Sequence, residues 1–217
     1  MGVVLSIRGT SGSGKTSVAR RFLPAPITGG PKGGPVDLNA YPAPTKRDPA
    51  RLLRVTGYVR ESTQLGRIGV CGPYHNACGG MDQLGSFEIC RGAILHLLQE
   101  LDCKFVIAEG LLASGVYGSW GEFSALLRAQ GHAFAFCYLQ TPLDVCKTRV
   151  KARQAEAGKP DKEINWGNLD AKYEQVISNR EKALAAGELV YDLPYGREVE
   201  AVIDIMSGQG EKYRGHS

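Results

Sequence analysis

The stretch that decides the fold reads VVLSIRGTSGSGKTSVARRF and covers residues 3–22. It opens with a short β-branched and apolar run at residues 3–7, which predicts a strand. Residues 9–16 follow at once and fit the pattern G-x-x-x-x-G-K-(S/T). Apolar residues then recur at helical spacing, at Val18, Ala19, Phe22 and Leu23. The stretch therefore predicts a strand, a glycine loop and a helix in that order.

This loop pattern, the P-loop or Walker A motif, is typical of proteins that bind ATP-type nucleotides. Its glycines let the backbone wrap closely around phosphates, while backbone N–H groups and the helix N-terminus supply positive potential. We expect Lys15 to reach the β- and γ-phosphates and Thr16 to ligate Mg²⁺. The residues expected to bind the nucleotide are Gly9, Thr10, Ser11, Gly12, Ser13, Gly14, Lys15 and Thr16. A chance match is the alternative, but both flanks have the required strand and helix character.

Further along the chain, strand-type and helix-type patterns alternate. Helical spacing recurs at residues 84–101, 119–130, 141–157, 169–184 and 199–206, and strand-type runs cover 54–59, 68–72, 104–108, 133–139 and 189–191. The first two of these strands could form a hairpin. Such alternation is typical of a mainly parallel sheet with helices on both faces. We expect one α/β domain over residues 1–217, a three-layer sandwich that binds ligands at the carboxyl ends of its strands.

Three segments are expected to lack regular structure. Residues 24–35 contain four Pro and four Gly, and seven of the eleven prolines occur by residue 49, which predicts a mobile loop over about 24–50. A polar break at residues 158–161 interrupts the helical patterns, so we expect a small lid over about 147–165. The polar residues 208–217 are expected to fray.

The charge is distributed unevenly along the 217 residues. The chain has 26 Lys and Arg against 22 Asp and Glu, and 43% of it is hydrophobic, which excludes a disordered chain, a coiled coil and a collagen-like fibre. Residues 1–67 carry a net charge of +8 and residues 68–217 a net charge of −4. The basic part at residues 32–67 suggests an anionic partner, although a solvated loop rich in Lys and Arg is an alternative.

Cysteine usage and hydropathy indicate the compartment. Six cysteines without a C-x-x-C pair are typical of reduced thiols. A zinc site from Cys71, His75 and Cys78 would lack an evident fourth ligand, so we do not expect one. No run approaches 18 apolar residues, and the N-terminus leads directly into the glycine loop. We therefore expect a cytoplasmic protein with neither a membrane span nor a signal peptide.

A strand-end acid and a group of basic helix residues are two further candidates for a role in phosphate transfer. The run FVIAEG at residues 105–110 predicts a strand that ends in Glu109, beside the phosphate loop, where a carboxylate can hold Mg²⁺ or orient water. Arg149 and Arg153 share one face of a helix, as do Lys147 and Lys151. If the lid closes, the two arginines would stabilise the moving phosphoryl group. The alternative for Glu109 is a strand-end acid without a role, and the alternative for the basic residues is an ordinary solvated helix face.

The least ordinary stretch is GPYHNACGGMD at residues 72–82, between a predicted strand and a long helix. This is where a substrate loop should lie in such a fold. We expect Asp82 to act as a general base that accepts the proton of a substrate hydroxyl, although a helix-capping role is the alternative. The residues expected to contact substrate are Tyr74, Asn76, Gly79, Gly80 and Asp82.

Together these motifs resemble the P-loop kinases of the thymidylate-kinase-like group. The resemblance spans most of residues 1–157 and rests on the loop at 9–16, the Ala108-Glu109-Gly110 strand end, and TPLDVC at 141–146 leading to Arg149 and Arg153. More narrowly, residues 72–82 with their Cys-Gly-Gly-x-Asp core resemble bacteriophage 5-hydroxymethyluracil DNA kinases. The chain lacks the Asp-Arg-Tyr/Phe motif that thymidylate kinases use for a free monophosphate.

The narrower resemblance implies an enzyme that uses ATP and Mg²⁺ to phosphorylate the hydroxymethyl group of 5-hydroxymethyluracil in phage DNA. It implies a step toward hypermodified thymidines that shield viral DNA from host restriction nucleases, in the host cytoplasm. Lys15, Asp82, Arg149 and Arg153 would then be catalytic, with Thr16 and Glu109 at the metal.

A DNA substrate has physical consequences. Because the phosphate site of such a fold lies in a cleft, the base would have to be flipped or read from a single strand. The basic segment at 32–67 would grip backbone phosphates, and Tyr74 or Tyr58 would stack on the base. The alternatives are a P-loop kinase acting on a free nucleoside, nucleotide or other small molecule, and a nucleotide switch without enzymatic activity.

Overall fold

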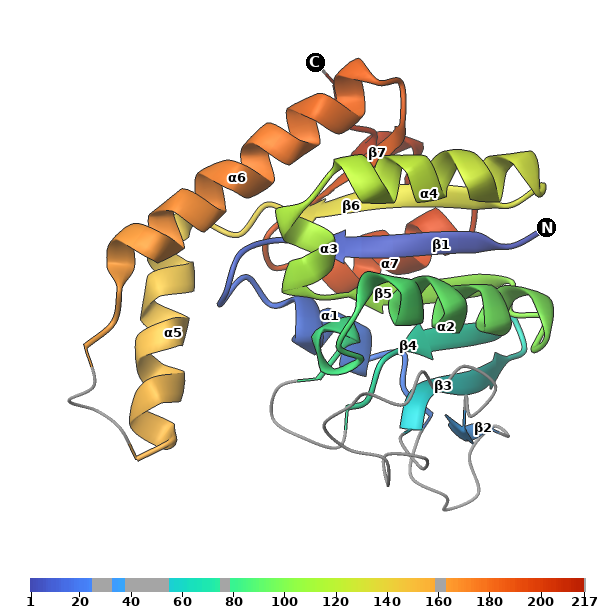
Figure 1. Ribbon diagram of the computed structural model, residues 1–217, viewed down its shortest axis with the longest axis horizontal. Coiled ribbons are helices and arrows are strands. Elements are labelled where there is room, and N and C mark those ends of the chain that lie inside the picture. The colour runs from blue at the N-terminus through green and yellow to red at the C-terminus, as the bar shows by residue number, and fades with distance from the viewer. Residues whose placement is uncertain (25–32, 38–54, 75–78, 159–162, 217) are drawn as a thin grey trace.

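The computed structural model describes residues 1–24, 33–37, 55–74, 79–158 and 163–216, which build one seven-stranded sheet with helices against it (Figure 1). The strands are β1 (Val3–Arg8), β2 (Gly33–Asp37), β3 (Val55–Ser62), β4 (Gly66–Cys71), β5 (Phe105–Glu109), β6 (Ala133–Leu139) and β7 (Leu189–Leu193). The α-helices are α1 (Lys15–Arg20), α2 (Phe87–Gln99), α3 (Leu111–Gly115), α4 (Gly118–Ala129), α5 (Leu143–Glu156), α6 (Trp166–Ala185) and α7 (Glu198–Met206). The 3₁₀ turns are η1 (Met81–Gln83) and η2 (Gly210–Tyr213).

The sheet has the strand order β2-β3-β4-β5-β1-β6-β7. The five strands from β4 to β7 in this order run parallel, whereas β2 and β3 pair antiparallel at one edge. β1 lies in the centre, with Ile7 in register with Glu109 of β5 and Cys137 of β6. The carboxyl ends of these strands therefore meet at one edge of the sheet, where the loop after β1 begins.

Helices cover both faces of the sheet, each over its own apolar cluster. On one face the buried residues of α2 and α4 pack against β1, β5 and β6, with Trp120 and Phe123 of α4 at the centre. On the other face α1 and α7 pack against the same strands (Figure 1). Residues alternate between the faces along β1, where Val4 belongs to the first cluster and Leu5 to the second. The expected α/β three-layer sandwich with a mainly parallel sheet is confirmed.

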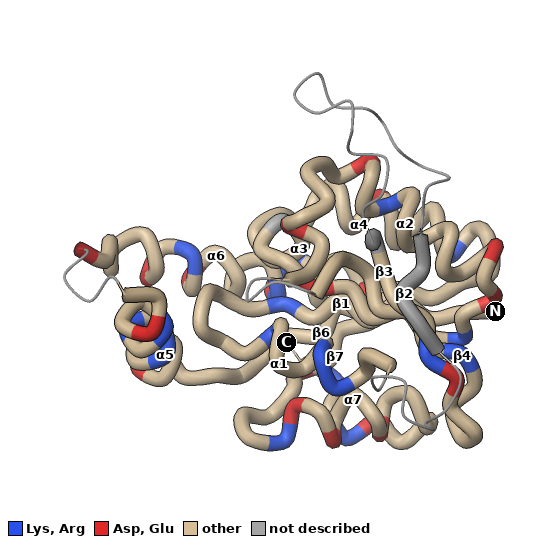
Figure 2. Tube along the Cα trace, turned by 90° about the horizontal axis from the view of Figure 1, so that it is seen from below, with Lys and Arg blue, Asp and Glu red and all other residues tan. Residues whose placement is uncertain are grey.

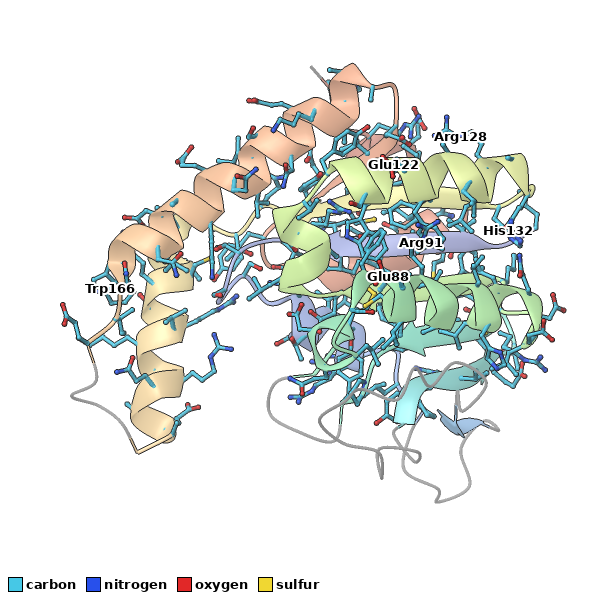
Figure 3. The ribbon with its side chains drawn as sticks, viewed as in Figure 1. Glu88, Arg91, Glu122, Arg128, His132 and Trp166 are labelled. Atoms are coloured by element: carbon cyan, nitrogen blue, oxygen red, sulfur yellow. The ribbon has the colours of Figure 1, made fainter. Side chains whose placement is uncertain are left out.

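α2 and α4 are joined by an arginine as well as by apolar contact. The Arg91 guanidinium of α2 lies 4.9 Å from the ring centroid of Phe123 in α4 and 5.4 Å from that of Phe87 (Figure 3). Its positive charge faces the electron-rich ring faces, and its aliphatic stem covers apolar surface. Arg91 therefore stabilises the pairing of two neighbouring helices and has no part in the edge where the strands end.

α5 and the first half of α6 extend beyond the sheet as an arm (Figure 1). Trp166, the first residue of α6, lies at the far end of this arm (Figure 3). Lys147 of α5 forms an ion pair with Asp170 of α6, 2.7 Å between Nζ and Oδ1, which links the two helices. Most of α5 lies within residues 147–165, where the sequence predicts a lid, whereas α6 begins after that segment.

Several sequence predictions need correction. β2 lies at residues 33–37, inside the segment predicted to be an irregular loop, because main-chain pairing with β3 supplies the regularity that Pro and Gly propensities argue against. The tail predicted to fray instead forms η2, where the buried Tyr213 hydroxyl donates to Asp204 at 2.8 Å. The short helix α3 has no counterpart among the predicted elements.

Other predictions fall outside the described residues. They concern His75, Asn76 and Cys78 of the substrate stretch, most of the loop at 24–50, and residues 159–161 of the polar break. The hairpin expected from the strand patterns near residues 54–72 is confirmed by the antiparallel pairing of β3 with β4. No helix within the described ranges combines the length and apolarity needed to cross a membrane.

We expect Ser86→Ala to lower the free energy of unfolding by about 1 kcal/mol. Ser86 is the N-cap of α2, and its hydroxyl oxygen accepts the N–H of Ile89 at 3.3 Å, so alanine leaves that amide without its cap. Urea unfolding of the purified protein measures the difference. Ser207→Ala is the control, since Ser207 is exposed after α7, and a loss of equal size in both variants would contradict the capping role.

Candidate functional site

The loop between β1 and α1 holds the glycine conformations that the motif requires. Gly12 has a φ of 81°, a backbone region that side chains disfavour. A Cβ at this position would also lie 2.4 Å from the carbonyl oxygen of Cys146, the buried residue that α5 turns toward the loop. Glycine is therefore needed at position 12 both for the turn and for the close approach of α5.

Lys15, the first residue of α1, lies buried under this loop with 7% of its surface exposed. Its ammonium donates to the carbonyl oxygens of Gly9 and Thr10, both at 2.9 Å. Burial lowers the pKa of Lys15, and the nearby carboxylates of Glu109 and Asp82 oppose that shift. The structure thus places one cation and two carboxylates around the loop, as expected from the sequence.

Glu109 is the most buried acid of this group. Its side chain is 2% exposed at the end of β5, and its Oε1 accepts the hydroxyl of Thr16 at 3.1 Å and that of Tyr74 at 3.2 Å. Burial raises the pKa of Glu109, against the favourable field of Lys15 and the hydrogen bond from Thr16. A strand-end acid with neighbours of this kind is suited to orienting groups around a phosphate.

The donor set here suits Mg²⁺ better than a transition metal. Mg²⁺ takes oxygen ligands, commonly one or two carboxylates together with hydroxyl, water and phosphate oxygens. Thr16 and Glu109 offer a hydroxyl and a carboxylate that already touch each other. Among the described residues, no group of three or more His, Cys, Asp or Glu could hold a metal by itself. The residues present therefore fit a Mg²⁺ ion that arrives with a nucleotide.

Asp82 lies in η1 opposite the start of α3. Its Oδ2 accepts the N–H of Leu111 at 2.7 Å, so the carboxylate caps α3. The cap of α2, which the sequence left as an alternative role for Asp82, belongs to Ser86 instead. The position of Asp82 next to Glu109 is thus held by a main-chain hydrogen bond, with its Oδ1 facing Gly110, where a Cβ would lie 2.8 Å away.

The segments that carry Asp82 and Glu109 approach each other closely at two glycines. Gly80, two residues before Asp82, has a φ of 93° and lies directly against Glu109. A Cβ on Gly80 would lie 2.4 Å from Oε1 of Glu109 and 2.8 Å from its carbonyl oxygen. Each acid therefore sits against a glycine of the other segment, and a side chain at either glycine would displace a carboxylate.

α5 is tied to the loop at three points. The Thr141 hydroxyl donates to the carbonyl oxygen of Ser13 at 2.8 Å, and Arg149 donates to the carbonyl oxygens of Gly12 and Ser13 at 3.3 and 3.4 Å. The Arg149 guanidinium also lies 5.5 Å from the ring centroid of the half-exposed Tyr195. Together with the contact between Gly12 and Cys146, these bonds fix the angle of the arm at the loop.

The remaining basic residues of α5 point away from acidic partners, with one exception. Lys147 pairs with Asp170, whereas the exposed Lys151 and Arg153 form no ion pair within the described parts of the chain. The charge of Arg153 lowers the pKa of Lys15, so its guanidinium acts on the same region. Figure 2 shows the basic residues of α5 gathered at the end of the molecule where the arm lies.

Tyr74 is placed differently from the expectation that it stacks on a substrate base. Its ring is 6% exposed, packs in the apolar cluster beside α1, and lies under Gly79, where a Cβ would be 2.5 Å from Cδ1. A ring enclosed in this way offers no free face for stacking. Its hydroxyl instead serves Glu109. Asn76 lies outside the described residues.

The described part of the predicted DNA-gripping segment is also internally bonded. Arg67 pairs with Glu61 at 2.7 Å and donates to the carbonyl oxygen of Leu101, and Arg60 donates to the carbonyl oxygen of Arg21 at 3.3 Å. The other basic residues of that segment, from Lys32 to Arg54, lie outside the described residues. Arg60 and Arg67 thus link the β3–β4 hairpin internally and to the ends of α1 and α2.

Two residues that support the loop were not predicted from the sequence. Ser114 of α3 accepts the N–H of Gly9 at 3.1 Å, and its neighbourhood carries no motif. Thr141 lies two residues before α5, and its hydroxyl donates to the loop, while Pro142 is the N-cap residue of α5. Both side chains are 1% exposed, and only the packing of distant segments reveals their role.

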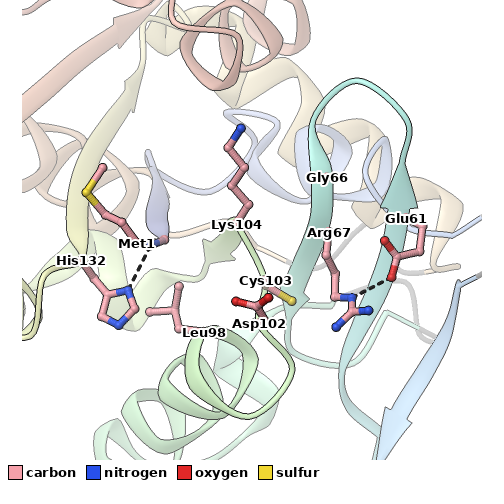
Figure 4. Close-up of a pocket in the computed structure, with 10 residues that line it drawn as sticks. Met1, Glu61, Gly66, Arg67, Leu98, Asp102, Cys103, Lys104 and His132 are labelled. Carbon is pink, nitrogen blue, oxygen red and sulfur yellow. Dashed lines mark hydrogen bonds and ion pairs between the residues drawn. The ribbon is translucent and has the colours of Figure 1, made fainter.

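A hollow of about 430 Å³ opens at the opposite edge of the sheet, at the amino ends of the strands (Figure 4). Its lining groups are largely bonded to one another, with His132 accepting the N–H of Gly2 at 3.1 Å and Arg67 paired with Glu61. It contains none of the residues grouped around the phosphate loop. The candidate site residues lie instead at the carboxyl ends of the strands.

We expect Gly80→Ala to weaken the affinity for ATP in the presence of Mg²⁺ at least tenfold, because the new Cβ displaces the carboxylate that contacts Thr16. Isothermal titration calorimetry measures this affinity. Gly85→Ala is the matched control, since Gly85 has a nearly equal φ of 92° but no atom within 4 Å of the added Cβ. Similar losses in both variants would show that backbone strain, not the contact with Glu109, is responsible.

The whole chain resembles two curated phage proteins. It is 30% identical over 208 residues to a "5-hmdU DNA kinase" of Pseudomonas phage M6, a match that covers 92% of this chain and 97% of that protein. It is 31% identical over 185 residues to a "5-hmdU DNA kinase" of Pseudomonas phage PaMx11, covering 85% of this chain and 86% of that protein. No protein-family model matches the chain.

Both matches cover most of this chain and most of the relative. Their names agree with a site that combines a glycine loop, a buried lysine and two carboxylates. The protein is a phosphotransferase, and its chain belongs to the family of 5-hmdU DNA kinases.

Proposed function

We propose that this protein transfers the γ-phosphoryl group of ATP to the hydroxymethyl group of 5-hydroxymethyluracil within DNA. The observation that carries the proposal is that a relative named 5-hmdU DNA kinase aligns with 92% of this chain, whose structure brings Lys15 near Glu109 and Asp82. A free nucleoside, nucleotide or other small molecule is the alternative acceptor, and the experiment below separates the two.

The nucleotide would bind through the loop from Gly9 to Thr16. The ammonium of Lys15, now bonded to loop carbonyls, is the cation best placed to turn to the β- and γ-phosphates. Burial lowers the pKa of Lys15, and its neighbours Glu109 and Asp82 oppose this shift and so favour the charged form. Thr16 and Glu109 would hold Mg²⁺, which when bound neutralises phosphate charge.

Asp82 is proposed as the general base. The N–H of Leu111 donates to its Oδ2 and fixes the carboxylate, which would accept the proton of the hydroxymethyl group. The substrate oxygen forms a bond to the γ-phosphorus, the bond from that phosphorus to the bridging oxygen breaks, and ADP leaves. Gly79 and Gly80 would line the acceptor side, where they already place backbone against Tyr74 and Glu109.

Arg149 and Arg153 would stabilise the charge of the moving phosphoryl group from α5. Arg149 already contacts the loop through Gly12 and Ser13, and Arg153 follows one turn later on the same face. Removing a donor to a transition-state charge typically costs about 3–4 kcal/mol of barrier. α5 thus adds two positive charges to that of Lys15.

The DNA backbone would lie along α5. Lys151 is exposed and forms no ion pair within the described residues, so it can meet a phosphate without first breaking a bridge. A base inside a duplex cannot reach Asp82, so we infer that the base is flipped out or presented in a single strand. Affinity that depends on such contacts falls steeply with salt.

The biological role that we propose follows from the product. A phosphorylated hydroxymethyl group is activated for replacement, so the reaction would be a step toward hypermodified thymidines that protect phage DNA from restriction in the host cytoplasm. This role rests on the proposed acceptor and has no independent support from the geometry of the site.

We expect Asp82→Asn to lower the rate of phosphoryl transfer at saturating substrates by about 10²–10⁴-fold. Asparagine keeps an oxygen for the N–H of Leu111, so the fold and the affinity for ATP should remain, while the carboxylate that accepts the proton is gone. Steady-state assays with purified variants measure the rate. Glu122→Gln, an exposed acid on α4 (Figure 3), serves as the control for loss of a negative charge. Retention of the wild-type rate in Asp82→Asn would remove Asp82 from this role.

The acceptor is tested by offering ATP labelled in the γ-phosphate to 5-hydroxymethyldeoxyuridine, to its monophosphate and to DNA that contains the base. We expect label in the DNA alone. Lys15→Ala should reduce the transfer to background while keeping the thermal midpoint, since it removes the cation that binds the phosphates. Label in a free nucleoside or nucleotide would favour the alternative acceptor, and nucleotide binding without transfer to any acceptor would indicate a switch.

A further inference from the structure

Tyr74 is buried, and its hydroxyl contacts Glu109, the carboxylate proposed to hold Mg²⁺. Its side chain is 6% exposed, and its hydroxyl donates to Oε1 of Glu109 at 3.2 Å. Burial raises the pKa of Tyr74 well above its usual range, and the charge of Glu109 adds to the shift, so the hydroxyl keeps its proton and donates at physiological pH. A buried hydroxyl that donates to a buried carboxylate fixes both groups.

The tyrosine itself has little freedom to move. Its N–H donates to the hydroxyl of Tyr58 at 3.3 Å, and the two rings lie 6.2 Å apart between centroids. Gly79 rests on the other side of the ring, since a Cβ there would lie 2.5 Å from Cδ1. The ring is therefore enclosed by backbone, by Tyr58 and by the apolar cluster, and the hydroxyl has one acceptor within the described residues.

Glu109 uses the same oxygen for a second donor. Thr16 donates its hydroxyl to Oε1 at 3.1 Å, and a threonine that gives its proton to a carboxylate presents its oxygen lone pairs in the opposite direction. A cation ligated by Thr16 needs those lone pairs. The orientation of Thr16 thus depends on Oε1, and the position of Oε1 depends on the Tyr74 hydroxyl.

We propose that Tyr74 is a positioning residue, which holds Oε1 of Glu109 where it orients the Thr16 hydroxyl toward a nucleotide-bound divalent cation. The inference rests on the proposed function, because it assigns a role within the same nucleotide site. It replaces the expectation that Tyr74 stacks on a base, and it adds a residue that acts through Glu109 and touches neither nucleotide nor acceptor.

Tyr213 provides a matched control within the same chain. It is 7% exposed, and its hydroxyl donates to the carboxylate of Asp204 at 2.8 Å, beside α7 and away from the phosphate loop. Tyr74→Phe and Tyr213→Phe both delete one buried hydroxyl from one carboxylate and keep the ring. Their effects on stability should be comparable, so a difference in metal binding isolates the role of Tyr74.

The experiment measures Mn²⁺ binding by electron paramagnetic resonance in the presence of a non-hydrolysable ATP analogue and without any acceptor. We expect Tyr74→Phe to weaken Mn²⁺ affinity roughly tenfold, as is typical when a partner of a metal-site residue is lost. Affinity for the analogue in EDTA should stay within twofold of the wild type, because the loop and Lys15 are unchanged. Tyr213→Phe should match the wild type in both measurements.

Two results would overturn the proposal. One is Mn²⁺ affinity of Tyr74→Phe within twofold of the wild type, and the other is an equal loss in Tyr213→Phe, which would show a general effect of stability. Because no acceptor is present, the outcome is independent of the acceptor assay. A protein that phosphorylates no DNA but loses Mn²⁺ affinity in Tyr74→Phe would refute the proposed function and retain the positioning role.

Discussion

A carboxylate that is almost completely removed from water needs partners, and this requirement organises the site around Glu109. The side chain is 2% exposed, yet it receives hydroxyls from Thr16 and Tyr74 and lies in the field of Lys15. Lys15 and Thr16 belong to the start of α1, and Tyr74 belongs to the stretch after β4. Strand register supplies the proximity, because β1 and β5 are neighbours with Ile7 opposite Glu109. Burying one acid therefore specifies how three segments meet.

The close approach of these segments depends on the absence of side chains. Gly80 lies against Glu109, and Gly110 lies against Asp82. A Cβ at either glycine would overlap with the facing carboxylate. The same principle governs the arm, since Gly12 lets the backbone at Cys146 come within van der Waals contact of the loop. Thr141 and Arg149 then add hydrogen bonds to loop carbonyls. A movement of α5 would consequently shift the loop between β1 and α1.

Much of the fold could be predicted from the sequence because its signals are local. The run at residues 133–139 is uniformly apolar and becomes the buried strand β6, and the spacing from Leu84 to Leu101 becomes α2. β2 and η2 were missed because their stability comes from contacts with other elements: β2 pairs with β3, and Tyr213 of η2 donates to Asp204 of α7. The residue types of the site were also predictable, since a glycine loop, a lysine and strand-end acids form recognisable motifs. The role of Tyr74 was not, because aromatic residues in a loop are compatible with both stacking and burial.

The sequence by itself determined the class of the fold, the phosphate loop with Lys15 and Thr16, and the resemblance that the phage relatives bear out. These features depend on the order of residues within short stretches, where backbone preferences and hydrophobic periodicity act. Only the tertiary structure decided which oxygen each donor serves: that Asp82 caps α3, that Thr141 holds Ser13, and that Tyr74 and Thr16 share Oε1 of Glu109. The physical reason is that hydrogen-bond partners over sequence separations of 29 to 128 residues are set by strand register and helix packing, which no single stretch encodes.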